Sequence, residues 1–75
     1  MFNLVLGTNM SPRNLGVTLK RIRNRKKLTQ VALGKAAKVH PVYIAQIEAG
    51  TKVPSIATLE KIAKALNVRV GRLLD

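Results

Sequence analysis

Acidic residues, cysteine and aromatic residues are scarce or missing in this chain of 75 residues, and each shortage narrows what the protein can be. With no cysteine, neither a disulfide framework nor a thiolate metal site can hold the fold. The single histidine, His40, cannot form a cluster of metal ligands, so we expect no metal and no cofactor. The only acids are Glu48, Glu60 and Asp75, which are scattered and form no Ser–His–acid set. We therefore expect that the protein is not an enzyme.

Long apolar runs are also missing. No apolar stretch approaches the roughly 20 residues that a membrane-spanning helix needs, so we expect no membrane partner. The apolar segment "MFNLVLG" at positions 1–7 is too short for a secretory signal and lacks a basic leader. A cytoplasmic location is the resulting expectation.

Positive charge and small aliphatic residues are what the chain has in abundance. There are 14 Lys and Arg against 3 Asp and Glu, which gives a formal net charge of +11. Such an excess says nothing about the fold, but it indicates a polyanionic partner such as nucleic acid or an acidic protein. Hydrophobic residues make up 47% of the chain, mostly Val, Ile, Leu and Ala, which is enough for one small core.

Apolar residues at helical spacing predict an all-α domain of five short helices over residues 11–75, preceded by an apolar tail over residues 1–10. Ser11, Thr29 and Ser55 stand where hydroxyl groups can cap helix starts. A third helix is expected over Pro41–Ala49, ended by Gly50. The residues expected to face the core are Leu15, Leu19, Ile22, Leu33, Ala36, Ala37, Ile44, Ile47, Ile56, Leu59, Ile62, Ala63, Leu66, Val70 and either Leu73 or Leu74.

The segment "AAKVHP" joins the second and third expected helices by a short turn, which is the helix-turn-helix arrangement. Helices that cross so closely need a small residue inside the first one, and Gly34 is in place. An apolar residue must close over the turn, which Val39 can do. Ile44 and Ile47 supply the branched apolar inner face of the second helix. These features are strong evidence because they occur together and in register.

The sequence from "LTQ" at 28–30 through "IEAG" at 47–50 to "LEKIAKAL" at 59–66 resembles the helix-turn-helix domain of the XRE family, which includes the lambda-type repressors and Cro. The pattern "H-x-x-YI-x-x-IE-x-G" is most similar to the controller proteins of restriction–modification systems. The resemblance implies a compact lambda-repressor-like domain that binds double-stranded DNA sequence-specifically and regulates transcription. Because a single recognition helix reads only a few base pairs, we also expect a homodimer on a near-palindromic operator.

If Pro41–Ala49 is the recognition helix, its lack of Lys and Arg has a reason. Base edges are read in the major groove by hydrogen bonds and by contacts with thymine methyl groups, whereas cations on the flanks bind phosphates. We expect Gln46 to pair with adenine and Val42 to pack on methyl groups. The remaining expected contacts to DNA come from His40, Pro41, Tyr43, Gln30, Lys26, Lys27 and Lys52. His40 can instead cap the helix, Pro41 can simply start it, and Tyr43 can serve in packing.

The resemblance also implies a role for the neighbours of this helix. It pairs Arg23 with Glu48 in a partly buried salt bridge, and it makes Gln30 a brace of the recognition helix as well as a phosphate contact. Lys38 departs from the family pattern, because it stands where the turn usually has a glycine. A non-glycine residue in a left-handed conformation costs about 1 kcal/mol.

Other binding functions remain open from the sequence. An antitoxin or co-activator could use the face around Val42 and Tyr43, or the tail, to bind a toxin or the transcription machinery. An RNA-binding protein is less well supported, because RNA readers stack bases on aromatic residues and only 3% of this chain is aromatic. Contacts within a dimer are expected from Val70, Leu73 and Leu74 or from the tail.

Overall fold

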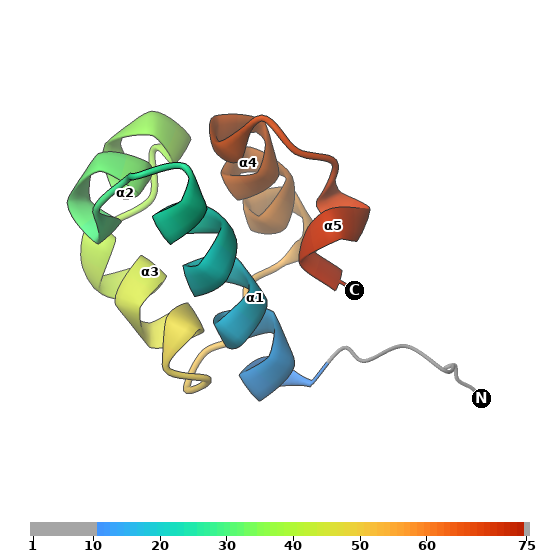
Figure 1. Ribbon diagram of the computed structural model, residues 1–75. Coiled ribbons are helices and arrows are strands. Elements are labelled where there is room, and N and C mark those ends of the chain that lie inside the picture. Colours follow the sequence, from blue (N-terminus) through green and yellow to red (C-terminus); the bar gives the residue numbers. More distant parts are fainter. Residues whose placement is uncertain (1–10, 75) are drawn as a thin grey trace.

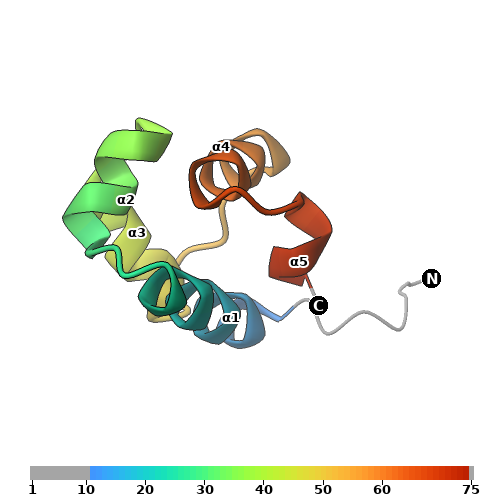
Figure 2. The same cartoon turned by 45° about the horizontal axis from the view of Figure 1, so that its top comes forward.

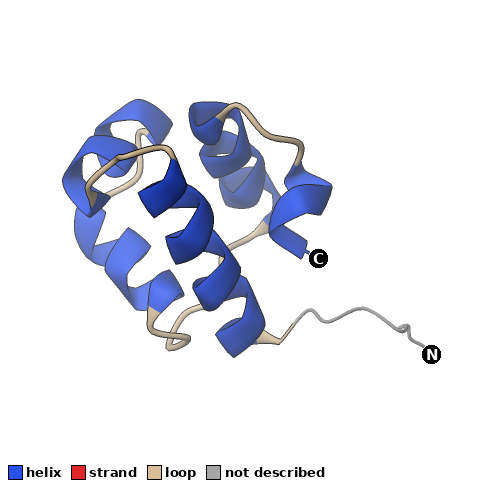
Figure 3. Ribbon diagram, in the orientation of Figure 1, coloured by secondary structure: helices blue, strands red, loops and turns tan. Residues whose placement is uncertain are grey.

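The computed structural model describes residues 11–74, and the predictions made for the tail at 1–10 and for Asp75 lie outside that part. Five helices and no strand make up the described residues (Figures 1 and 3). They are α1 (Pro12–Arg25), α2 (Gln30–Ala37), α3 (Pro41–Glu48), α4 (Ile56–Leu66) and α5 (Val70–Leu74). The prediction of five helices in an all-α domain is therefore confirmed.

Local hydroxyl groups start three of the helices, as predicted. The Ser11 Oγ accepts from the Asn14 N–H at 3.0 Å, and the Thr29 Oγ1 accepts from the Ala32 N–H at 2.9 Å. At the start of α4 the Ser55 side chain accepts from the Thr58 N–H at 3.1 Å. Each bond satisfies a backbone donor that has no partner within its own helix.

Each of the helices α1 to α4 is followed, within two residues of its end, by a residue with left-handed backbone. These residues are Lys27, Lys38, Gly50 and Asn67, with φ between 58° and 80°. After each one, the next N–H turns back to the carbonyl five residues earlier, for example from Val39 to Gly34 at 2.8 Å. The N–H of the left-handed residue itself also donates, to the carbonyl three residues earlier. Together the two hydrogen bonds satisfy the last carbonyls of each helix. Two of the four positions are lysines, although glycine would adopt the conformation more easily.

The core is built from one apolar stripe per helix. Its twelve buried hydrophobic residues are Leu15, Leu19, Ile22, Leu33, Ala37, Ile44, Ile47, Leu59, Ile62, Ala63, Leu66 and Leu73. Helix α2 packs against α3 and against α4, α1 packs against α3, and α5 closes the core between α4 and α1 (Figures 1 and 2). As a result, α3 is held from its inner side by α1 and α2 and leaves its outer side open.

Two predicted core positions are wrong. Ile56 is 59% exposed because it is the first residue of α4 and lies beyond the edge of the core, where Pro54 is buried instead. Ala36 is exposed because Leu33 and Ala37 already fill the inner side of α2. The recognition helix ends one residue earlier than predicted, at Glu48, with Ala49 as its cap.

Helix α5 offers fewer exposed apolar residues for contact with a second copy than predicted. Leu73 is buried in the core, with 1% of its surface exposed, so it cannot serve as a contact between two copies. Val70 and Leu74 are half-buried against the core. None of the helices within residues 11–74 is both long and apolar enough to cross a membrane.

Candidate nucleic-acid interface

The turn between α2 and α3 has the tight geometry that the sequence predicted. A Cβ atom at Gly34 would lie 2.5 Å from the Val39 carbonyl oxygen and 3.2 Å from the Pro41 ring, so only glycine fits. Lys38 takes the left-handed conformation at φ 58°, and Val39 then packs against the core. The spacing of "GKAAKVHP" therefore fixes the angle at which α3 leaves α2.

The first turn of α3 is capped by an imidazole. The Nδ1 atom of His40 accepts from the Val42 N–H at 3.1 Å, and Pro41 occupies the first helical position. Proline suits that position because its backbone has no N–H that would need a partner. Capping was one of the two roles expected for His40.

Opposite faces of α3 differ sharply in burial. Ile44 and Ile47 are fully buried, whereas Val42 is 56% exposed. The outer face consists of His40, Pro41, Val42, Ala45, Gln46 and Ala49, which are exposed or half-buried. We call these six residues the reading face. Tyr43 is half-buried and packs against the core, in keeping with its expected packing role.

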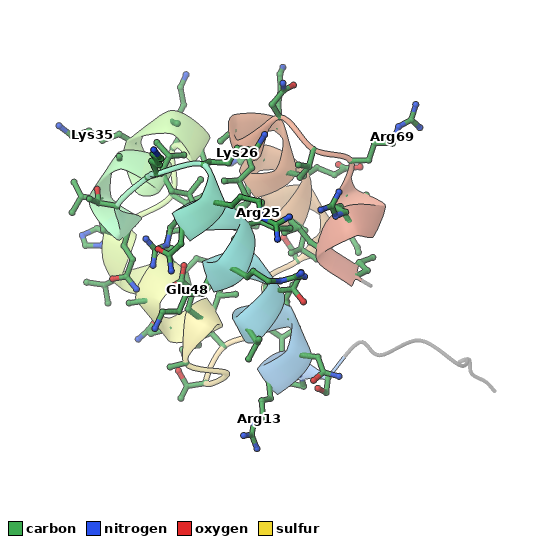
Figure 4. The ribbon with its side chains drawn as sticks, in the orientation of Figure 1. Arg13, Arg25, Lys26, Lys35, Glu48 and Arg69 are labelled. Carbon is green, nitrogen blue, oxygen red and sulfur yellow. The ribbon has the colours of Figure 1, made fainter. Side chains whose placement is uncertain are left out.

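An ion pair ties the end of α3 to α1. The Nε of Arg23 donates to Glu48 Oε2 at 2.6 Å, and its Nη2 donates to Glu48 Oε1 at 3.0 Å. The side chains are only 9% and 4% exposed, so this is the partly buried salt bridge that the resemblance implies. The Nη1 of Arg23 also donates to the Leu28 carbonyl at 2.7 Å. Figure 4 shows Glu48 beside α1, at the junction of the two helices.

The same carboxylate holds the start of α2. The Nε2 of Gln30 donates to Glu48 Oε1 at 3.1 Å, so Gln30 braces α3 as the resemblance implies. An amide nitrogen carries two hydrogens, and the second is free of this bond and suited to a phosphate oxygen. We call Arg23, Glu48, Gln30 and the Leu28 carbonyl the bracing network.

Arg23 keeps its positive charge at neutral pH. The hydrogen bond to Glu48, helped by its negative charge, raises the pKa of Arg23 above its ordinary value, although burial acts in the opposite direction. A raised pKa means that the stabilisation from Arg23 is fully present below its unfolded-state pKa and is lost only in strong alkali. No loss of this contact is expected from titration of Arg23 at neutral pH.

Three of the cations that are expected to contact phosphates are exposed. Lys26 and Lys27 occupy the turn between α1 and α2, close to the start of α2, and Lys52 lies in the loop after α3. Figure 4 shows Lys26 and Arg25 together at the end of α1, with Lys35 at the outer end of α2.

Two structural residues of this site were missed in the sequence. Thr51 donates both its N–H and its hydroxyl to the Gln46 carbonyl, at 3.0 and 3.1 Å, and so fastens the end of α3. A Cβ atom at Gly16 would lie 2.5 Å from the carbonyl oxygens of Ile47 and Glu48, so this glycine sets the approach of α1 to α3. A hydroxyl residue after the "IEAG" glycine could have indicated Thr51, whereas nothing local marks Gly16.

Three features define a helix-turn-helix domain. The turn between α2 and α3 is short and fixes the angle between the two helices, the outer face of α3 carries no Lys or Arg, and α3 is held on its inner side by the bracing network. Comparison with known proteins agrees: residues 19–73 match the helix-turn-helix family. The chain belongs to this family, in its XRE branch of DNA-binding transcriptional regulators.

Two relatives and two solved structures illustrate the match. The immunity repressor of Bacillus phage phi105 is 40% identical over 80% of this chain, but only 42% of the repressor's length is covered. Control protein C.BamHI of Bacillus amyloliquefaciens is 38% identical over 80% of this chain and 75% of its own length. The controller C.AhdI of Aeromonas hydrophila has a TM-score of 0.83 and 25% identity, covering 84% of this chain and 96% of that one. SinR, solved in complex with DNA, has a TM-score of 0.78 and 35% identity over 81% of this chain and 98% of its own.

Proposed function

We propose that this protein regulates transcription by placing the reading face of α3 in the major groove of a specific double-stranded DNA site. The observation that carries the proposal is the contrast between the reading face and its surroundings. The face contains no Lys or Arg, whereas Lys26 and Lys27 are exposed in the turn before α2 and Lys52 is exposed in the loop after α3. Hydrogen bonds and methyl contacts distinguish base pairs and cations neutralise phosphates, so this separation of charge supports a reading face with phosphate contacts beside it.

Gln46 is the proposed base-reading residue, and Val42 is its apolar neighbour one turn earlier on the same face. A glutamine amide offers a donor and an acceptor together, which matches adenine in the major groove. Pro41 and His40 approach the same groove at the helix start. Gln30, Lys26, Lys27 and Lys52 contact the backbone, and Tyr43 acts mainly in packing. The role is one of binding without catalysis, in the cytoplasm where the DNA is accessible.

The active form in this proposal is a homodimer on a near-palindromic site. One α3 of eight residues reads only a few base pairs, and two-fold symmetry doubles the site. Because Leu73 is buried, the half-buried Val70 and Leu74 on α5 are the candidates for the contact within residues 11–74.

Selection from randomised duplexes tests the proposal directly. Purified protein should enrich one motif, and titration of that duplex at several salt concentrations should give affinities that fall steeply as salt rises. Each neutralised phosphate contributes about −0.9 to the slope of log affinity against log salt. Absence of an enriched motif, together with a protein co-purifying through α3, would favour the antitoxin or co-activator role instead.

A further inference from the structure

A second group of lysines lies where α2 meets α4. Lys38, Lys61 and Lys64 line one hollow of about 340 Å³ together with Ala36, Ala37 and Ala65. No acidic residue lines this hollow, and all three lysines are exposed. Within residues 11–74 the ion pair of Arg23 and Glu48 is the one present, so none of these lysines has a carboxylate partner there. We call this site the lysine hollow.

Helix stability alone does not explain the lysine hollow. Lys64 lies in the last turn of α4, where a cation is favourable to the helix dipole. Lys61 lies a turn earlier and gains little in this way. Lys38 is placed at a cost, because its backbone is left-handed at φ 58° and glycine would take that conformation with less strain. A strained position that keeps a charged side chain points to a use for that charge.

The residues that line the lysine hollow favour a polyanion as its ligand over a folded protein. Apart from the lysines, its lining contains only alanines, so a protein partner would find no large apolar or aromatic side chain to pack against. Interfaces between proteins depend on such anchors. A phosphate backbone needs only point charges on a shallow surface, and it is read without regard to sequence.

The lysine hollow and the reading face are built on different helices and come together only at the turn that carries Lys38 and His40. No residue of α3 lines the hollow, and α3 and α4 pack against different sides of α2 (Figures 1 and 2). Residues 11–74 measure 36 Å at their longest, whereas duplex DNA stays straight over about 500 Å. A straight duplex bound along α3 should therefore leave Lys61 and Lys64 on α4 free.

We infer that the lysine hollow binds the phosphate backbone of a second DNA segment, so that one protein bridges an operator and a neighbouring stretch of DNA. The inference rests on the proposed function, since it takes α3 to be occupied by the operator. The operator segment is read by sequence, and the second segment is held by charge alone.

The test uses the full chain and two duplexes. The operator duplex found by selection is fixed to beads and saturated with protein, and retention of a labelled duplex without the motif is then measured. Wild-type protein should retain the labelled duplex. The double variant K61Q/K64Q should lower affinity for it by up to about eightfold per lost contact at 0.1 M salt, while the fixed operator stays bound. The variant K38G should lower the affinity for the labelled duplex by the amount expected for one lost contact. Because this variant also removes backbone strain, misfolding cannot account for the loss.

The double variant R69Q/R72Q is the matched control, because it removes the same charge from the turn before α5 and from α5 itself. It should retain the labelled duplex as wild type does. Equal losses in both double variants would overturn the inference, since net charge would then suffice. Displacement of the labelled duplex by poly-glutamate more readily than by unlabelled DNA of equal charge would overturn it in favour of an acidic protein. Loss of operator binding by wild-type protein would instead refute the proposed function, and the bridging inference with it.

Discussion

At the scale of single residues, Glu48 has the most connections in the site. Its carboxylate accepts from Arg23 on α1 and from Gln30 on α2, while its own backbone belongs to α3. One acid therefore sets the relative positions of three helices. Its side chain is 4% exposed, so removing it leaves the Arg23 guanidinium with one remaining partner, the Leu28 carbonyl.

Replacing Glu48 by Ala should destabilise the fold by about 3–5 kcal/mol, because a buried charge loses its counter-ion. A domain of this length has roughly 4–11 kcal/mol of stability in total, so the variant should be close to unfolding. Glu60→Ala on the exposed side of α4 is the control, and it should change stability by less than about 0.5 kcal/mol. Urea denaturation measures both. Equal midpoints for the two variants would contradict the importance of the bracing network.

Lys38 allows the opposite prediction, a variant that gains stability. Lys38→Gly should stabilise the fold by about 0.5–1 kcal/mol, because glycine adopts φ 58° without strain. Lys35→Gly removes the same charge from a right-handed helical position and should destabilise by about 1 kcal/mol. The pair separates the effect of backbone conformation from that of charge. Thermal melting of both variants at equal salt is sufficient, and a shift of the same sign in the two would exclude the conformational explanation.

Gln46 and the flanking lysines should differ in what they contribute to DNA binding. Gln46→Ala should flatten the preference at one position of each half-site and cost about 1–3 kcal/mol there. Lys26→Ala and Lys27→Ala should weaken binding to all sequences alike and lower the salt slope by about one each. Selection from randomised half-sites with each variant distinguishes the two behaviours. An unchanged motif with Gln46→Ala would mean that α3 docks in another way.

At the scale of secondary-structure elements, two glycines determine how closely helices approach. Gly34 faces the Val39 carbonyl in the turn, and Gly16 faces the carbonyls at the end of α3. In both places the neighbouring atoms are backbone, which cannot rotate away as a side chain can. The recognition helix is thus positioned at its start by Gly34 and at its end by Gly16 and the bracing network.

Gly16→Ala and Gly34→Ala should each destabilise the fold, although alanine favours helix formation. A Cβ atom 2.5 Å from a carbonyl oxygen forces the helices apart, at a cost of about 1–3 kcal/mol. Gly71→Ala is the matched control, because nothing lies within 4 Å of the added atom, and it should stabilise α5 by up to about 1 kcal/mol. Chemical denaturation of the three variants tests this. A gain in stability at Gly16 or Gly34 would contradict the close approach.

Short-range signals in the sequence explain why the starts of the helices could be predicted. The caps at Ser11, Thr29 and Ser55 act within four residues, so they could be identified without knowing the fold. The need for Gly16 could not be identified, because its neighbours are more than 30 residues away in the chain and meet it only after packing. Ile56 continues the apolar period of α4 but lies past the end of the core, and periodicity carries no information on where a core stops.

Part of the site was predictable from the resemblance, namely the pair of Arg23 with Glu48 and the brace from Gln30. The DNA contacts of Gln46, Val42 and the lysines stay predictions, and the structure adds that Gln46 and Val42 lie on the outer face of α3. The lysine hollow did not follow, because its lining comes from the end of α2 and the second half of α4. Only the packing of those helices brings Lys38 beside Lys61 and Lys64.

At the scale of the whole molecule, the net charge of +11 and the single reading helix together favour a symmetric complex. One α3 contacts few base pairs, so a lone chain would owe most of its affinity to phosphates and discriminate poorly between sequences. Two chains related by two-fold symmetry double the bases read and the phosphates neutralised. Both the specificity and the salt dependence of binding should therefore depend on the number of half-sites present.

Two chains should bind a duplex that carries both half-sites, and one chain should bind a duplex that carries only one. In the symmetric complex the two α3 helices enter successive major grooves on one face of the DNA, with half-site centres about 10 base pairs apart. Inserting about 5 base pairs between the half-sites turns them to opposite faces, so joint binding should be lost while each half-site still binds weakly. Sedimentation of the protein with the three duplexes measures the stoichiometry. The salt slope on the complete site should be about twice that on a single half-site. A one-to-one complex on the complete site, with the slope of a half-site, would show that a monomer reads this DNA.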